Sequence, residues 1–319
     1  MITETSEYNS LAIIIPMKNE ESIASATIDS VLSVLRETPI AGKLICVDDG
    51  SNDRTWSILS ERASQEPDLI AIKLSRNFGH DAALFAGMTI ADTDAVITMD
   101  ADGQHPFHLI PNIVEFWRKD KCSIVNCVKR DRGDEAARYS LFAHFFSSVL
   151  SQALGTDMNN ATEFKLLDRR AVATLLSCRD SHIFYRALAP WIGYRQEQFS
   201  FDVLPSTRGY SSWNIPRLMR FAINGLVNFS DLPLRILIYI GLPAVAVSFL
   251  LLLKLLISYV FFEVPEGYST LLAISLLNLG AMMTGLGIVG IYTRATLIQS
   301  LERPRWIIET ISFSKGEDK

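Results

Sequence analysis

Two long apolar runs near the C-terminal end constrain the fold more than any other feature of this sequence. Residues 236–262 contain one charge, Lys254, and residues 267–293 contain none. A helix needs roughly 20 apolar residues to cross a bilayer. Buried helices of soluble proteins rarely extend this far without a polar stripe. The sequence therefore predicts two transmembrane helices, at about 236–260 and 269–293, which form a hairpin.

Charges beside these runs predict the orientation of the hairpin. The connecting loop carries only Glu263 and Glu266, whereas six arginines flank the pair: Arg217, Arg220, Arg235, Arg294, Arg303 and Arg305. Because positive charge accumulates in cytoplasmic loops, we expect both ends of the hairpin in the cytoplasm. The expected location is the cell (inner) membrane, multi-pass, with the N-terminal domain cytoplasmic.

Composition and segment boundaries support a domain followed by an anchor. The 319 residues have a net charge of -5, and 49% are hydrophobic, which excludes a disordered chain and disfavours a nucleic-acid-binding surface. Four cysteines without a C-x-x-C pair are expected to be reduced. We divide the chain into four segments. The soluble domain covers residues 1–210, and an amphipathic interface helix covers 211–232. The hairpin covers 233–293, and a cytoplasmic tail covers 294–319. For the amphipathic segment, packing against the soluble domain is the alternative.

The soluble domain alternates short apolar runs with helical patterns. Expected strands lie at 11–15, 43–47, 69–74, 95–99 and 123–127, and expected helices near 20–36, 53–65, 80–92 and 107–119. Such alternation predicts an α/β fold with a parallel sheet covered on both faces. Ligands bind beyond the carboxyl ends of strands in these sheets.

The loops after the predicted strands carry the polar residues that indicate chemistry. Asp100 and Asp102 follow the fourth strand, and their spacing by two directs both carboxylates to one side of an extended chain. Such a pair suits Mg²⁺ or Mn²⁺, which would also contact the phosphates of a nucleotide. The chain contains neither G-x-G-x-x-G after its first strand nor a phosphate-binding G-x-x-x-x-G-K-[ST] motif. A dinucleotide oxidoreductase and a P-loop nucleotidase are therefore disfavoured.

Four motifs in order resemble a known family. They are Ile13–Glu21, Val47–Thr55, Ser75–His80 and the Asp100–Asp102 block, followed by Thr162–Arg169, Trp191–Arg195 and the apolar tail. The chain resembles family 2 glycosyltransferases with the GT-A (Rossmann-like) fold. More narrowly, it is similar to the polyprenyl-phosphate glycosyltransferases, which include dolichyl-phosphate mannose synthases and bactoprenol glucosyltransferases.

The resemblance implies a role for each matching position. Binding of the nucleotide sugar is implied for Pro16, Glu20, Asp48, Asp49, Arg76 and Asp100, and a metal site for Asp100, Asp102 and Gln104. Asp100, Asp102 and Glu163 would be the catalytic residues. Because a lipid phosphate is already ionised near neutral pH, we expect Glu163 to orient the acceptor or help place the metal. Candidates for the lipid phosphate are Arg130, Arg132, Lys165 and Arg208.

The implied reaction is inverting, metal-dependent transfer of a hexose from a nucleoside-diphosphate sugar, UDP favoured over GDP, to polyprenyl phosphate. Alternatives are another lipid or polysaccharide acceptor, or a catalytically weak membrane scaffold. Ser206 and Ser212 stand where relatives commonly have Arg and Lys, which favours the scaffold, whereas the intact acidic residues oppose it. Expected partners are membrane lipid, a second copy packed through Gly280, Gly285, Gly287 and Gly290, and, from the family, a small membrane flippase.

Overall fold

The structure of this chain is a computed structural model that describes residues 10–102, 105–129, 162–178, 185–201 and 267–314, with single residues between 239 and 257. Its contacts divide the chain into two compact units. One unit combines Met1–Ser212 with Arg303–Lys319, and the other is Trp213–Glu302. The soluble unit is therefore built from both ends of the chain.

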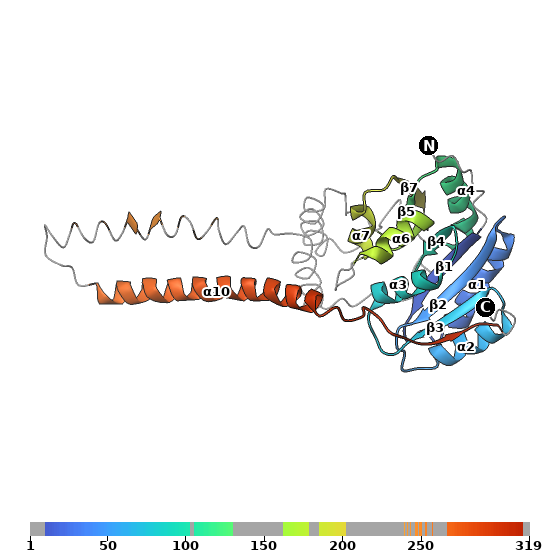
Figure 1. Cartoon of the computed structure of the whole chain (residues 1–319), viewed down its shortest axis with the longest axis horizontal. Helices are drawn as coiled ribbons and strands as arrows, with labels where there is room; N and C mark the ends of the chain where they lie inside the picture. Colours follow the sequence, from blue (N-terminus) through green and yellow to red (C-terminus); the bar gives the residue numbers. More distant parts are fainter. Residues whose placement is uncertain are drawn as a thin grey trace. The chain divides into compact units, whose positions relative to one another are not determined.

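A mixed eight-stranded sheet forms the soluble unit, in the order β7-β5-β6-β4-β1-β2-β3-β8 (Figure 1). In chain order the strands are β1 Ser10–Met17, β2 Ala41–Asp48, β3 Leu69–Leu74, β4 Ala95–Thr98, β5 Ile124–Lys129, β6 Lys165–Asp168, β7 Gln196–Phe201 and β8 Ile308–Ser312. Strands β1 to β4 are mutually parallel, as predicted. β6 and β8 run antiparallel to their neighbours, so the expected all-parallel sheet is corrected to a mixed one.

Helices cover both faces of this sheet. They are α1 Ala24–Glu37, α2 Thr55–Gln65, α3 His80–Ile90, the short η1 Phe107–Leu109, α4 Ile110–Asp120, α6 Arg169–Ser177 and α7 Tyr185–Trp191. Successive residues of β1 point to opposite faces. Ile13 and Ile15 pack in a core with α1, α2 and α4, whereas Ala12 and Ile14 pack in a second core with α3, α6 and α7. Both faces of β1 are apolar because both are buried.

Within the described residues, the second unit contains one helix suited to a membrane, α10, which extends over Tyr268–Ser300. At 1.5 Å per residue its 33 residues rise about 50 Å, more than a hydrocarbon core of about 30 Å. Asn278–Ser300 is apolar enough to cross a bilayer, and none of it is buried against the rest of the described chain. The first predicted span and the predicted interface helix lie largely or wholly outside the described residues, so α10 is the one candidate span that the structure describes.

The segment after α10 differs from the tail expected at 294–319. α10 continues to Ser300, and β8 then pairs antiparallel with β3, where Ile311 lies opposite Ile72. Between them, the Arg305 guanidinium lies 5.5 Å from the centre of the Phe85 ring on α3. Partly buried Trp306 packs on the same ring, with 6.2 Å between ring centres. The physical reason is that β3 would otherwise be an unpaired edge strand.

Candidate active site

Loops from several elements meet at one edge of the sheet. β1 to β4 end there because they are parallel, and β6 begins there because it runs antiparallel to β4, with Lys165 opposite Thr98. Asp100 follows β4 by two residues, and Glu163 precedes β6 by two residues. Two carboxylates separated by more than 60 positions in the sequence are thus brought to the same edge.

The two carboxylates that end β2 hold loops in place. Asp49 accepts hydrogen bonds from the backbone N–H of Phe78, at 2.7 Å, and of Gly79, at 3.0 Å. Asp48 accepts from the backbone N–H of Ser51 at 3.2 Å, and its Oδ2 is buried without a hydrogen-bond partner. Burial raises the pKa of both carboxyls, although these hydrogen bonds oppose the rise. Asp49 therefore positions the loop that follows β3.

The loop after β1 is joined to the loop after β2. The backbone N–H of Asn19 donates to Ser51 Oγ at 2.9 Å, and the Asn19 side chain accepts from the N–H of Asn52 at 2.9 Å. The backbone N–H of Glu20 donates to Thr55 Oγ1 at 2.8 Å. The three loops after β1, β2 and β3 consequently form one hydrogen-bonded platform.

Gly50 allows two of these loops to approach closely, and its replacement by alanine is expected to destabilise the platform. Its φ is 65°, and a Cβ would lie 2.5 Å from the backbone of Arg76 and Asn77. We expect Gly50→Ala to cost about 2 kcal/mol or more, from backbone strain together with the clash. Thermal unfolding of the purified protein measures this loss. Gly193→Ala is the matched control, because Gly193 has a φ of 72° but no neighbour closer than 4.0 Å; equal losses in both variants would contradict the close approach.

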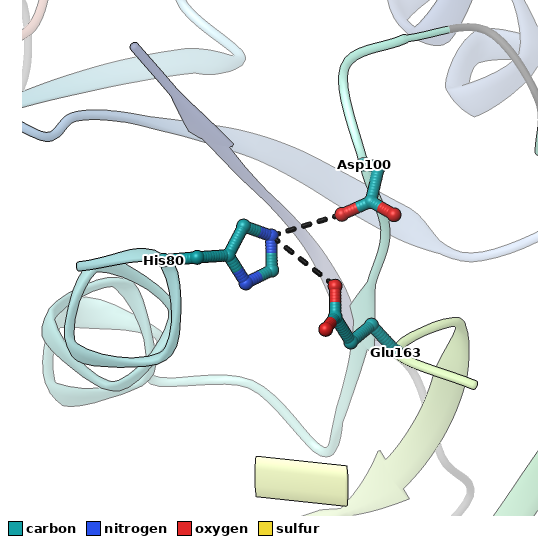
Figure 2. A group of neighbouring side chains, drawn as sticks. All are labelled: His80, Asp100 and Glu163. Atoms are coloured by element: carbon teal, nitrogen blue, oxygen red, sulfur yellow. Dashed lines mark hydrogen bonds and ion pairs between the residues drawn. The ribbon is translucent and has the colours of Figure 1, made fainter. Parts of the chain in front are cut away.

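The centre of the site is a cluster of His80, Asp100 and Glu163 (Figure 2). His80 is the first residue of α3, and its Nε2 lies 2.9 Å from Asp100 Oδ1 and 3.4 Å from Glu163 Oε2. The side chains are 38%, 28% and 15% exposed, respectively, so the cluster is accessible but largely surrounded by protein. This is the set of described residues whose donor atoms converge closely enough to hold a metal ion.

The charges in this cluster are strongly coupled. Burial lowers the pKa of His80, but the hydrogen bond with Asp100, the nearby carboxylate of Asp81 and the charge of Glu163 outweigh it and raise that pKa to about 10. Burial raises the pKa of Asp100, yet its histidine neighbours hold that pKa well below its ordinary value. Burial raises the pKa of Glu163 despite the nearby charges of Arg186 and His80. His80 thus lies between the two carboxyl groups and favours the ionised form of both.

Further side chains contact the carboxylate oxygens of Glu163 and Asp100 that face away from His80. Arg186 on α7 donates from Nε to Glu163 Oε1 at 2.8 Å. The backbone N–H of Asp100 donates to His105 Nδ1 at 3.1 Å, so His105 carries its proton on Nε2, which lies 3.9 Å from Asp100 Oδ2. The ring of His105 stacks on Phe164 and is 5% exposed, which keeps it in one orientation.

Other residues predicted for the site occupy several environments. Pro16 is buried in β1, opposite Val47. Arg76 is exposed, with its guanidinium 4.5 Å from the centre of the Phe78 ring. Asp102 is partly exposed in the turn after β4 and is not among the converging donors. Gln104, Arg130, Arg132 and Arg208 lie outside the described residues.

Lys165, a predicted candidate for the lipid phosphate, lies inside the sheet. Its side chain is 1% exposed in β6, and its Nζ donates to Asn126 Oδ1 at 2.5 Å. Burial lowers the pKa of Lys165 to about 8. The Lys165 side chain is buried because β6 is an interior strand of the sheet, with β4 on one side and β5 on the other.

Sequence reasoning assigned no role to His80, His105 or Arg186. His80 ends the motif Ser75–His80, and His105 follows the Asp100–Asp102 block by three residues. A histidine directly after a predicted strand–loop motif was a usable signal. Arg186 offered none, because its partner Glu163 is 23 positions away and on a different element.

Fold and site together define an α/β enzyme with its reactive groups at the carboxyl edge of a sheet, where such folds bind ligands. The family model for glycosyl transferase family 2 matches residues 12–179. The chain belongs to this family and is a glycosyltransferase, as the motifs predicted.

Relatives extend the comparison over nearly the whole chain. An uncharacterized glycosyltransferase of Synechocystis sp. is 33% identical over 306 residues, covering 94% of this chain and 95% of its own. The bactoprenol glucosyl transferase of Shigella phage SfV is 29% identical over 301 residues, covering 94% and 98%. Among solved structures, a glucosyl-3-phosphoglycerate synthase from Mycobacterium tuberculosis, in complex with Mn²⁺, UDP-glucose and phosphoglyceric acid, has a TM-score of 0.48 at 20% identity, covering 69% of this chain and 79% of its own.

Proposed function

We propose that this glycosyltransferase moves a hexose from a nucleoside-diphosphate sugar, with UDP favoured, to polyprenyl phosphate. The observation that carries the proposal is the relation to bactoprenol glucosyl transferases, which extends over 94% of this chain. An alignment of that extent includes most of α10 as well as the soluble unit. A lipid acceptor is consistent with a helix whose apolar side chains are exposed, such as Leu279, Met282 and Leu286.

The site supports inverting transfer in a single displacement. A divalent cation, Mg²⁺ or Mn²⁺, held at Asp100 would stabilise the departing nucleoside diphosphate. By the resemblance, Asp102 and Gln104 contribute to that metal site. Glu163 is fixed by Arg186 and lies beside Asp100, which suits a residue that orients the acceptor phosphate.

Binding of the donor is assigned to the joined loops. Pro16, Glu20, Asp48, Asp49 and Arg76 stand on the platform that the ends of β1, β2 and β3 form. The buried Oδ2 of Asp48 offers an acceptor to a donor group of the nucleotide. Asp49 contributes indirectly, because both of its oxygens hold the loop that carries Arg76.

For the membrane, we propose an even number of crossings and a cytoplasmic catalytic unit. The segments before and after the second unit belong to the same soluble unit. A compact unit lies on one side of a membrane, which supports a chain that crosses between those segments and returns. α10 supplies one crossing, and residues 236–260 are our candidate for the other. Arg130, Arg132, Lys165 and Arg208 remain the candidates for binding the lipid phosphate.

The proposed acceptor is tested by assaying the purified full chain with Mn²⁺, a short polyprenyl phosphate and a panel of UDP- and GDP-linked hexoses. We expect a polyprenyl-phosphate hexose from a UDP-sugar, detected by mass spectrometry. Transfer only to diacylglycerol or to a polysaccharide would overturn the acceptor. Nucleotide binding without transfer to any acceptor would favour the membrane scaffold.

The role of Asp102 is tested separately. We expect Asp102→Ala to lower the rate of transfer at least about tenfold, because a lost metal ligand weakens stabilisation of the leaving group. Initial rates over a range of Mn²⁺ concentrations measure the effect. An unchanged rate and an unchanged Mn²⁺ dependence would remove Asp102 from the metal site.

A further inference from the structure

In the cluster of His80, Asp100 and Glu163, the donor atoms that face one another have the spacing of metal ligands. Adjacent ligands of an octahedral ion with bonds of about 2.1 Å lie about 3 Å apart, and opposite ligands about 4.2 Å apart. His80 Nε2 lies 2.9 Å from Asp100 Oδ1 and 3.4 Å from Glu163 Oε2, and all three donor atoms lie within 4.8 Å of one another. The three side chains come from three separate elements and point toward one position (Figure 2).

A charged side chain lies behind each of the three donors. His80 Nδ1 is buried without a hydrogen bond, and the nearest carboxylate oxygen, Asp81 Oδ1, lies 3.5 Å away. Glu163 Oε1 accepts from Arg186 at 2.8 Å, and Asp100 Oδ2 faces His105 Nε2 at 3.9 Å. A carboxylate behind the second nitrogen of a histidine is the usual support of a metal-binding imidazole. The arrangement thus has both the inner donors and the outer supports of a metal centre.

Asp81 is itself fixed. Its Oδ2 accepts a hydrogen bond from the backbone N–H of Tyr185 at 3.3 Å, at the start of α7. The Tyr185 hydroxyl is 2.8 Å from Thr98 Oγ1, which donates to the backbone oxygen of Glu163 at 2.6 Å. Asp81, which follows His80 in the chain, and the backbone of Glu163 are therefore connected through Tyr185 and Thr98, which limits independent movement of the two ligands.

We propose that His80 is a nitrogen ligand of the catalytic cation and forms, with Asp100 and Glu163, a site that selects a first-row transition ion such as Mn²⁺ over Mg²⁺. Mg²⁺ prefers a coordination sphere made of oxygen ligands only, whereas an imidazole ligand raises the affinity of a site for transition ions. That affinity is lower for Mn²⁺ than for Co²⁺. The two carboxylates balance the charge of the divalent ion. An octahedral ion keeps further positions for oxygen ligands. This inference rests on the metal dependence proposed above and adds His80 and Glu163 to the ligands named there.

Pulsed electron paramagnetic resonance of Mn²⁺ bound to the purified full chain tests the ligand directly. We expect hyperfine coupling to a directly bound ¹⁴N in the wild type, replaced by ¹⁵N coupling after labelling with ¹⁵N-histidine. The coupling should disappear in His80→Gln and persist in His108→Gln, since His108 is exposed on η1 outside the cluster. Bound Mn²⁺ without nitrogen coupling in the wild type, or coupling that persists in His80→Gln, would overturn the proposal.

Affinities provide a second readout. We expect His80→Gln to weaken Mn²⁺ binding at least about tenfold and Mg²⁺ binding much less, so that the preference for Mn²⁺ collapses. Asp81→Asn should weaken Mn²⁺ binding about tenfold while the nitrogen coupling remains, because Asp81 is a positioning residue. If His80→Gln lost the same affinity for Mn²⁺ and for Mg²⁺, the imidazole nitrogen would not be what selects Mn²⁺.

These measurements are distinguishable from the test of the proposed function. Nitrogen-bound Mn²⁺ in a protein that transfers no sugar to polyprenyl phosphate would support His80 as a metal ligand and show that the proposed acceptor is wrong. Transfer to polyprenyl phosphate by a protein whose Mn²⁺ lacks a nitrogen ligand would keep the acceptor and reject this inference.

Discussion

Asp100→Asn is expected to reduce sugar transfer about 10³-fold while leaving the fold intact. Asp100 is the residue shared by the proposed metal and donor sites, and its carboxylate lies 2.9 Å from His80. Asparagine preserves the shape of the side chain but removes the charge. Loss of one preorganised electrostatic contact at a reaction centre commonly costs 10²–10³ in rate, and here a metal ligand is lost as well.

Initial rates with saturating UDP-sugar measure this effect, and thermal unfolding checks the fold. Asp92→Asn is the matched control, since Asp92 is 85% exposed and makes only a surface ion pair with Arg169. Surface pairs of this kind contribute about 0–1 kcal/mol, so the control should retain full activity. A rate for Asp100→Asn within a few-fold of the wild type would place the reaction centre elsewhere.

Ending the chain after Glu302 is expected to destabilise the soluble unit strongly, although all of α10 is retained. The truncation removes β8 and the aromatic contact between Trp306 and Phe85. Losing a packed tryptophan alone costs about 3 kcal/mol or more, which corresponds to a decrease of about 5–10 °C in Tm. The backbone N–H of Ser75 also loses its acceptor, the backbone oxygen of Ile307.

Hydrogen exchange of the full and shortened chains measures this effect by segment. We expect faster exchange at Ser75 and along β3, because these amides lose protection when the edge opens. Exchange in β1 should change least, since that strand lies between β2 and β4. A chain that ends after Ser314 is the control, because it keeps β8 complete. Equal Tm values for the two truncated chains would show that β8 contributes nothing to stability.

The central fold was predictable because local patterns determine it. The apolar runs at 11–15, 43–47, 69–74 and 95–99 became the four parallel strands, since runs buried on both faces need no knowledge of distant partners. β8 was not predictable in this way. Its sequence Ile308–Ser312 is short and half polar, and only the free edge of β3 makes it a strand.

The site was predictable to the extent that motifs contain it. Asp100 and Glu163 were identified from the resemblance, and the structure brings them together. His80 joins them only because α3 begins beside the end of β4, a relation that spacing along the chain does not reveal. The burial of Lys165 was not predictable from its motif, because it depends on β6 being an interior strand with β5 pairing beside it.

The contribution of both chain ends to one sheet has a consequence for biosynthesis. During translation β3 emerges more than 230 residues before β8, and the apolar helix is made between them. The edge of β3 can be paired only after β8 has emerged from the ribosome, so all of α10 is made before this sheet is complete. Until then the edge of β3 is unpaired and open to wrong partners. The yield of folded protein should therefore depend on how fast the segment between β3 and β8 is synthesised.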